Sequence, residues 1–115
     1  MFTTIRRYRV KLGQADQAIR LAEVELVPVV SAIPGFVSYQ VLVVGPQTIA
    51  SVSTYRDRGA ADSANRVAAD WVERRLASVV DCPTDVTVGE VRISLSTARE
   101  KTPEHAAASP VSWSR

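Results

Sequence analysis

The spacing of apolar residues in this chain switches repeatedly between the two-residue repeat of a β-strand and the wider repeat of an amphipathic helix. This spacing predicts strands over residues 2–11, 36–44, 48–55 and 86–95, and helices over residues 15–33 and 60–80. The turn Gly45-Pro46-Gln47 is short, so the second and third strands should be antiparallel neighbours. The predicted order is therefore βαββαβ, which leaves few topologies.

Pro28 lies inside the first predicted helix. Proline has no backbone N–H, and its ring crowds the preceding turn. We therefore expect a kink at Pro28, or a separate short element over the last turns, before the helix ends at Pro34-Gly35.

A βαββαβ chain with two helices of this length is typical of an α+β, ferredoxin-like fold, in which a four-stranded antiparallel sheet carries both helices on one face. The other face is then uncovered, and neither alternate set of strand residues is plainly polar. One set contains Phe36, Leu42, Val44, Ile49 and Tyr55, and the other contains Val37, Tyr39, Val41, Val43, Ala50 and Val52. We therefore expect a homodimer in which a second copy of the sheet covers this face, with a folded-back tail as the alternative.

The chain has 115 residues, which is enough for one domain with one hydrophobic core. After residue 96 the sequence is polar and rich in small residues, so it buries too little apolar area to order itself. We expect a domain over residues 1–96 and a C-terminal tail over residues 97–115. The tail should be flexible or exchanged between subunits, with Trp113 as its anchor.

Charge, hydropathy and cysteine content exclude several classes of function. The net charge is only +2, so we expect no nucleic-acid partner. No apolar run reaches the roughly 20 residues of a membrane helix, and the first residues are charged where a secretory signal is apolar. We expect no membrane partner and a cytoplasmic location. The single Cys82 and the single His105 provide no cluster of metal ligands.

Two short segments carry a family resemblance in addition to the βαββαβ order. The sequence IPGFVSY at residues 33–39 closes the first helix into the second strand, and Trp71 stands within AADWV at residues 68–72. Over residues 1 to about 95 the chain resembles the dimeric α/β barrel superfamily, and within it the antibiotic biosynthesis monooxygenase-like domains. The resemblance implies a dimeric α/β barrel.

This group includes cofactor-free oxygenases of aromatic polyketides, haem-degrading enzymes and proteins with no known reaction. Haem-degrading relatives use an Asn on the first strand, a Trp on the second helix and a His about ten residues beyond that Trp. Here Arg6 stands at the strand position, and the residues about ten positions after Trp71 are Val80, Asp81 and Cys82. Because the His is missing, we expect no haem. The resemblance to cofactor-free oxygenases implies that no other cofactor is used.

Five side chains are candidates for a pocket: Arg6, Tyr39, Tyr55, Trp71 and Arg92. Trp71 lies on the apolar stripe of the second helix and either packs in the core or lines the pocket. The two tyrosine hydroxyls either mark a ligand cavity or reach the surface. An inward-pointing Arg6 or Arg92 must be paired or must face a ligand, and a salt bridge with Glu90 is the simpler outcome.

Two classes of function remain. The resemblance implies a cofactor-independent monooxygenase, an oxidoreductase acting on a small aromatic or quinone-like compound. The alternative is a dimer that binds a small apolar or aromatic ligand, or is purely structural, without catalysis. The sequence has no recognisable acid–base pair, which favours the second class.

Overall fold

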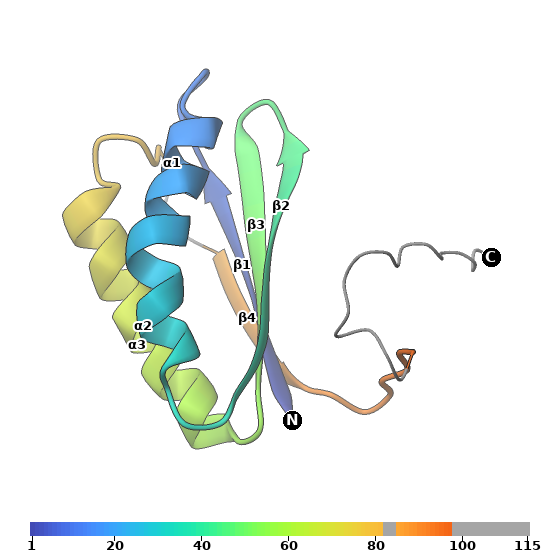
Figure 1. The fold of residues 1–115 in the computed structure, drawn as a ribbon. Helices are drawn as coiled ribbons and strands as arrows, with labels where there is room; N and C mark the ends of the chain where they lie inside the picture. The colour runs from blue at the N-terminus through green and yellow to red at the C-terminus, as the bar shows by residue number, and fades with distance from the viewer. Residues whose placement is uncertain (82–84, 98–115) are drawn as a thin grey trace.

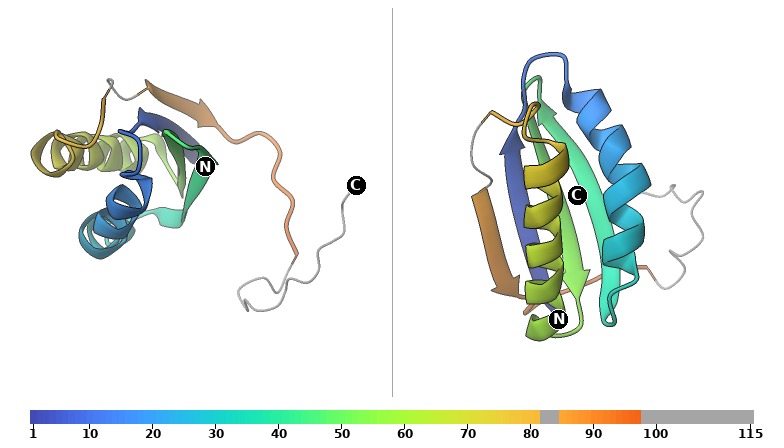
Figure 2. Two further views of the ribbon diagram at one scale, coloured as in Figure 1. Left: turned by 90° about the horizontal axis from the view of Figure 1, so that it is seen from above. Right: turned by 90° about the vertical axis from the view of Figure 1, so that its left-hand side faces the viewer.

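The computed structural model, which describes residues 1–81 and 85–97, has a four-stranded antiparallel sheet with its helices on one face (Figures 1 and 2). The strands are β1 (Phe2–Arg9), β2 (Phe36–Gly45), β3 (Thr48–Tyr55) and β4 (Asp85–Glu90), in the order β2-β3-β1-β4. The helices are α1 (Ala15–Leu21), η1 (Ala22–Leu26), α2 (Val27–Ser31) and α3 (Arg58–Arg75). The predicted α+β, ferredoxin-like fold and the β2–β3 hairpin are confirmed.

The segment predicted as one helix over residues 15–33 is three successive elements. The π-helix η1 lies between the two α-helices, and Pro28 is at the start of α2. In a helix the proline ring would clash with the preceding turn, and its missing N–H would leave a carbonyl without a donor. The π-helical turn η1 ends at Leu26, just before Val27 and Pro28. Its wider turn accommodates the proline ring and the missing N–H, so the expected perturbation appears as a π-bulge.

Two other predicted boundaries are wrong. The second helix ends at Arg75 and not near residue 80, because the chain turns back there so that Val10 and Val80 form an isolated bridge. The last strand ends at Glu90 and not near residue 95. Residues 91–97, the arm, are extended and leave the domain on the side of the sheet away from the helices (Figures 1 and 2).

The strand register decides which side chains lie beneath the helices. Arg6 is opposite Ser51 on β3 and Val86 on β4, and all three point toward the helices. A bulge between Phe36 and Ser38 shifts the alternation on β2, so that Phe36 and Tyr39 share this face. The two residue sets given by simple parity are therefore wrong, because each mixes the two faces.

The side of the sheet away from the helices is the open face. Its apolar residues are Ile5, Leu42, Ala50 and Val52. Leu42 is exposed by 49%, and on the same side the arm presents Ile93 and Leu95 at 92% and 95%. The structure holds one chain, so the homodimer remains a prediction. The tail beyond residue 97, with its anchor Trp113, lies outside the described residues.

The core beneath the helices has two parts. Trp71, Tyr8, Leu26 and Val30 belong to the first part, between α3, η1, α2 and the sheet. The second part surrounds Tyr55 and includes Ala60, Ala61 and Ala64 of α3. These small side chains bring α3 close to β1 and β3. No helix in the described ranges is long and apolar enough to cross a membrane.

Candidate functional site

A row of polar side chains lies beneath the helices, where a core of this kind would ordinarily be apolar. The row contains Thr4, Arg6 and Tyr8 on β1, Tyr39 on β2, and Ser51, Ser53 and Tyr55 on β3. It follows from the alternation of these strands, which places every second residue on the helix side. Buried polar groups need partners, so this row is where a ligand-binding function is to be sought.

Arg6 is at the centre of this row and is only 4% exposed. Its Nη2 donates a hydrogen bond of 2.7 Å to the backbone carbonyl of Asn65 on α3. Its Nη1 has no hydrogen-bond partner among residues 1–81 and 85–97. The expected salt bridge with Glu90 is absent from the described ion pairs, because Glu90 is exposed and stands opposite Phe2 in the ladder.

Two phenols lie close enough to Arg6 for its charge to act on them. The pKa of Tyr39 is raised to about 12, mainly by burial and by the neighbouring Tyr8, against the opposing effect of Ser51. Burial also raises the pKa of Tyr8, against the opposing charge of Arg6. Both phenols are therefore protonated near neutral pH and can donate hydrogen bonds.

A small cavity of about 20 Å³ lies between these phenols and the first helical segments. Its wall includes Tyr8, Tyr39, Ser51, Ile19, Ala22 and Trp71. A larger groove of about 330 Å³ is lined by Ile19, Glu23, Val27, Tyr39 and Val41. The cavity and the groove share Ile19, Tyr39 and Val41, so they are neighbours on the two sides of the same side chains. The cavity has room for one or two small atoms, and the groove has the volume of a small-molecule site.

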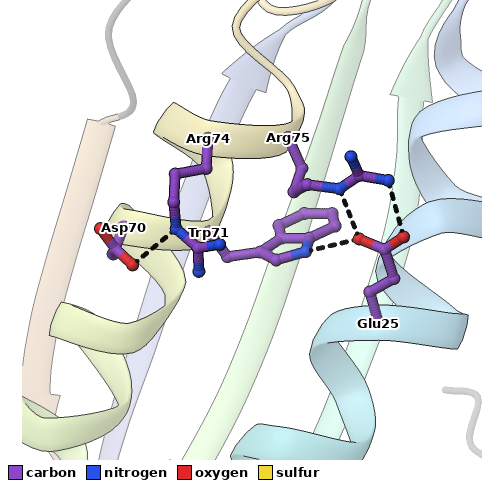
Figure 3. Close-up of polar contacts among 5 residues, drawn as sticks. All are labelled: Glu25, Asp70, Trp71, Arg74 and Arg75. Carbon is purple, nitrogen blue, oxygen red and sulfur yellow. Dashed lines mark hydrogen bonds and ion pairs between the residues drawn. The ribbon is translucent and has the colours of Figure 1, made fainter.

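Trp71 forms part of the cavity wall and is held in place by Glu25 of η1. Its indole Nε1–H donates to Oε1 of Glu25 at 3.0 Å, and Arg75 donates to both carboxylate oxygens at 2.8 and 2.9 Å (Figure 3). These donors lower the pKa of Glu25, Arg75 most and Trp71 next. On the same helix, Arg74 binds Asp70 at 2.9 Å. Trp71 is thus both a core residue and a pocket residue.

The five candidate residues do not all lie in one place. Tyr39 and Trp71 line the cavity. Arg6 does not line it, but lies close enough to Tyr39 for its charge to act on that phenol. The ring of Tyr55 packs edge-on against Phe36 in the second part of the core, and Tyr55 lines neither the cavity nor the groove. Arg92 is exposed in the arm, beyond the end of β4, and lines neither the cavity nor the groove.

Sequence reasoning missed Tyr8, Ser51 and Glu25. The strand alternation that placed Arg6 also places Tyr8 on the same face, so that signal was present. Ser51 requires the β1–β3 register, which a single sequence does not give. A buried indole N–H calls for an acceptor, but nothing in the spacing singles out Glu25.

The described residues contain no group of three His, Cys, Asp or Glu side chains that could hold a metal ion. Cys82 and His105 lie outside the described ranges. The expectation that the protein uses no cofactor therefore remains a prediction.

Comparison with known proteins gives one family and a set of similar folds. The family model described as antibiotic biosynthesis monooxygenase matches residues 1–69. No curated protein matches the chain.

Two of the similar solved structures cover most of both chains. A protein of unknown function from Nitrosomonas europaea has a TM-score of 0.71 at 19% identity, over 84% of this chain and 94% of that chain. A mutant of SnoaB, a cofactor-independent oxygenase from Streptomyces nogalater, has a TM-score of 0.65 at 16% identity, over 84% and 97%. Identities this low show a common fold.

Proposed function

This chain belongs to the antibiotic biosynthesis monooxygenase family, and on that premise we propose that it is a cofactor-independent monooxygenase acting on a small aromatic or quinone-like compound. The observation that carries the proposal is the groove of about 330 Å³ at Tyr39, which adjoins a cavity lined by two protonated phenols. The buried cation of Arg6 acts on both phenols from outside the cavity wall. The fold shared with a cofactor-independent oxygenase supports it.

In a cofactor-independent oxidation the substrate itself reacts with O₂, so the protein has few chemical tasks. A substrate with an acidic ring CH₂ loses a proton, and the resulting carbanion reacts with O₂ directly. One oxygen atom enters the ring as a carbonyl, and the other leaves as water together with the two hydrogens of the CH₂ group. The protein must hold the ring away from water, stabilise the developing oxyanion and accept the proton.

The described residues offer a side chain for each of these tasks. The apolar residues Ile19, Val27 and Val41 line the groove and would contact the ring. Tyr39 would donate its hydroxyl hydrogen to the oxyanion, since its raised pKa keeps it protonated. We assign the proton acceptor to Glu23, the carboxylate that lines the groove.

Oxygen uptake with anthrone as the substrate tests this proposal. We expect one O₂ consumed per anthrone oxidised, and a rate above that of the buffer. Tyr39→Phe and Glu23→Gln should each lower kcat/KM by about tenfold or more. Tyr55→Phe is the matched control for Tyr39→Phe, because the Tyr55 ring lies in the other part of the core and should leave the rate unchanged.

A rate equal to that of the buffer would favour the alternative function, a dimer that binds a ligand or has a structural role without catalysis. The small inner cavity supports that alternative, because a volume of about 20 Å³ is too small for an aromatic ring. Native mass spectrometry distinguishes a ligand-binding dimer from a purely structural one. A retained small aromatic molecule indicates a binding protein, and an empty chain indicates a structural one.

We also propose that the chain forms a homodimer through the open face. Leu42 is exposed there, and the arm leaves the domain on the same side with Ile93 and Leu95 exposed. A second copy, related by a two-fold axis, would cover both apolar surfaces at once. Light scattering during size-exclusion chromatography should give twice 12.5 kDa, and a stable monomer at micromolar concentration would contradict the dimer.

A further inference from the structure

Arg6 is a buried cation without a buried anion to match it. The three ion pairs among the described residues use Arg58, Arg74 and Arg75, and all three are at the surface. Arg6 is more than nine-tenths buried, and the groups that meet its charge are neutral: the carbonyl of Asn65 and the phenol of Tyr8. An unmatched buried charge is strongly unfavourable, and a chain retains one where a ligand supplies the opposite charge.

Part of the donor capacity of Arg6 is unused. Nη2 donates to Asn65, whereas Nη1 has no acceptor in the described part of the chain. The neighbouring hydroxyl of Thr4, on the same face of β1, is also buried and without a partner. Two buried orphan groups at neighbouring positions on one face of β1 indicate a binding site for a polar group that the described residues do not supply.

The other polar groups around Arg6 reinforce a preference for negative charge. Tyr8 and Tyr39 have raised pKa values and remain protonated, so they add donors and no charge. Ser51 stands directly opposite Arg6 in the ladder and lines the inner cavity together with these two phenols. No described carboxylate lines this cavity. A site made of one guanidinium and several hydroxyls favours an oxyanion over a neutral or cationic group.

The dimensions of the site fix which part of a ligand reaches Arg6. The outer groove, of about 330 Å³, has room for a ring, whereas the inner cavity of about 20 Å³ accepts a group the size of an oxygen substituent. Tyr39 lines both, so a ring in the groove would direct a substituent along Tyr39 toward Ser51. Arg6 is not in the cavity wall but stands directly behind it, as the ladder partner of Ser51.

We propose that Arg6 is an anion subsite, and that the ligand of this protein is an aromatic compound with an ionised oxygen substituent, a carboxylate or a phenolate. The ring lies in the groove lined by Val27 and Val41, and the ionised oxygen is held by Nη1 of Arg6 with help from the Tyr39 hydroxyl. This inference rests on the proposed function for the position of the ring. It assigns Arg6 to binding, whether or not oxidation follows.

Matched ligands test the proposal in the full chain. Trp113→Phe leaves Trp71, in the cavity wall, as the only tryptophan, and its fluorescence then reports binding of benzoate and of its neutral counterpart benzamide. We expect benzoate to bind about tenfold more tightly than benzamide. Arg6→Met should abolish that preference, and Arg6→Lys should retain part of it. Arg7→Met is the matched control, because Arg7 is the next residue on β1 and is exposed on the open face.

A second measurement needs no variant at Arg6. 4-Nitrophenol changes its absorbance on ionisation, so its apparent pKa can be read while it is bound. We expect the bound pKa to fall by about one unit or more below the value in buffer, because the guanidinium favours the phenolate. The benzoate and nitrophenol arms also distinguish a carboxylate site from a phenolate site.

Equal binding of benzoate and benzamide together with an unshifted nitrophenol pKa would overturn the inference, as would no detectable binding of any of the three probes. A charge preference that survives in Arg6→Met would overturn it too. Oxygen uptake is measured separately with neutral anthrone. A chain that prefers anions but consumes no oxygen would therefore contradict the oxygenase proposal alone.

Discussion

The indole N–H of Trp71 on α3 donates a hydrogen bond of 3.0 Å to Oε1 of Glu25 in the π-helical turn η1. The same carboxylate accepts two hydrogen bonds from Arg75, one turn further along α3 (Figure 3). Glu25 therefore ties the irregular part of the first helical segment to the second helix. Both elements line the inner cavity, so this contact fixes its width.

Glu25→Gln should lower the melting temperature by a few degrees at neutral pH, because the amide keeps an acceptor for Trp71 but loses the ion pair with Arg75. The pKa of Glu25 is held below its ordinary value of 4.5 in the folded chain. A lowered pKa gives stability that is present above the ordinary pKa and is lost as the pH falls through the folded value. The difference between wild type and variant, followed by thermal unfolding, should therefore shrink below pH 4.5.

Asp70→Asn is the control for that experiment, since it is the same change in an ion pair that is exposed on both sides. An exposed pair within one helix contributes little, so we expect almost no change in melting temperature. Equal changes in melting temperature for the two variants at neutral pH would show that Glu25 contributes no more stability than a residue of an exposed ion pair.

Tyr39→Phe should make the chain more resistant to alkaline unfolding. The pKa of Tyr39 is raised from 10.0 to about 12, mainly because burial disfavours the phenolate. The folded state therefore holds its proton more tightly than the unfolded state, and stability decreases as the pH rises from 10 toward 12. Urea unfolding at pH 8 and pH 11 should show a smaller loss of stability in the variant. An identical loss in both proteins would contradict burial of the Tyr39 hydroxyl.

The order and type of the elements were predictable from the sequence because apolar periodicity changes at every boundary. The separate short element expected as one alternative at Pro28 is present as α2, whereas the π-helical turn η1 before it was not predicted. Strand faces were less predictable. The bulge between Phe36 and Ser38 reverses which residues of β2 face the helices, and no residue there indicates a bulge in the sequence.

The candidate site was predictable only in part. The alternation of β1 places Arg6 on one face, and the sheet register then decides that this face is the buried one. Arg92 was expected within a strand over residues 86–95, but the apolar alternation changes phase after Val88, and pairing with β1 ends at Glu90. Contacts between distant elements, such as Glu25 with Trp71, have no local signal.

Gly35→Ala should destabilise the fold more than Gly13→Ala. Both glycines have positive φ angles, 97° and 82°, so each substitution carries the cost of a left-handed conformation, about 1 kcal/mol. A Cβ at Gly35 would also lie 3.1 Å from the Cβ of Ala60 on α3, whereas a Cβ at Gly13 meets nothing within 4 Å. The difference in unfolding free energy between the variants isolates the contact with Ala60. Equal destabilisation would show that α3 moves away at little cost.

Leu42→Lys should convert the proposed dimer into a monomer. Leu42 lies on the edge strand β2, opposite Ala50, among the apolar residues of the open face, and a charge buried there between two copies would have no partner. Val43→Lys is the matched control, because Val43 is the adjacent residue, is exposed by 63% and points to the helix side. Light scattering should give 12.5 kDa for Leu42→Lys and twice that mass for wild type and Val43→Lys. Circular dichroism checks that the monomer keeps its fold. If Val43→Lys dissociates the dimer and Leu42→Lys does not, the two copies meet through the β2 edge or the helix side, and the open face must be covered in another way.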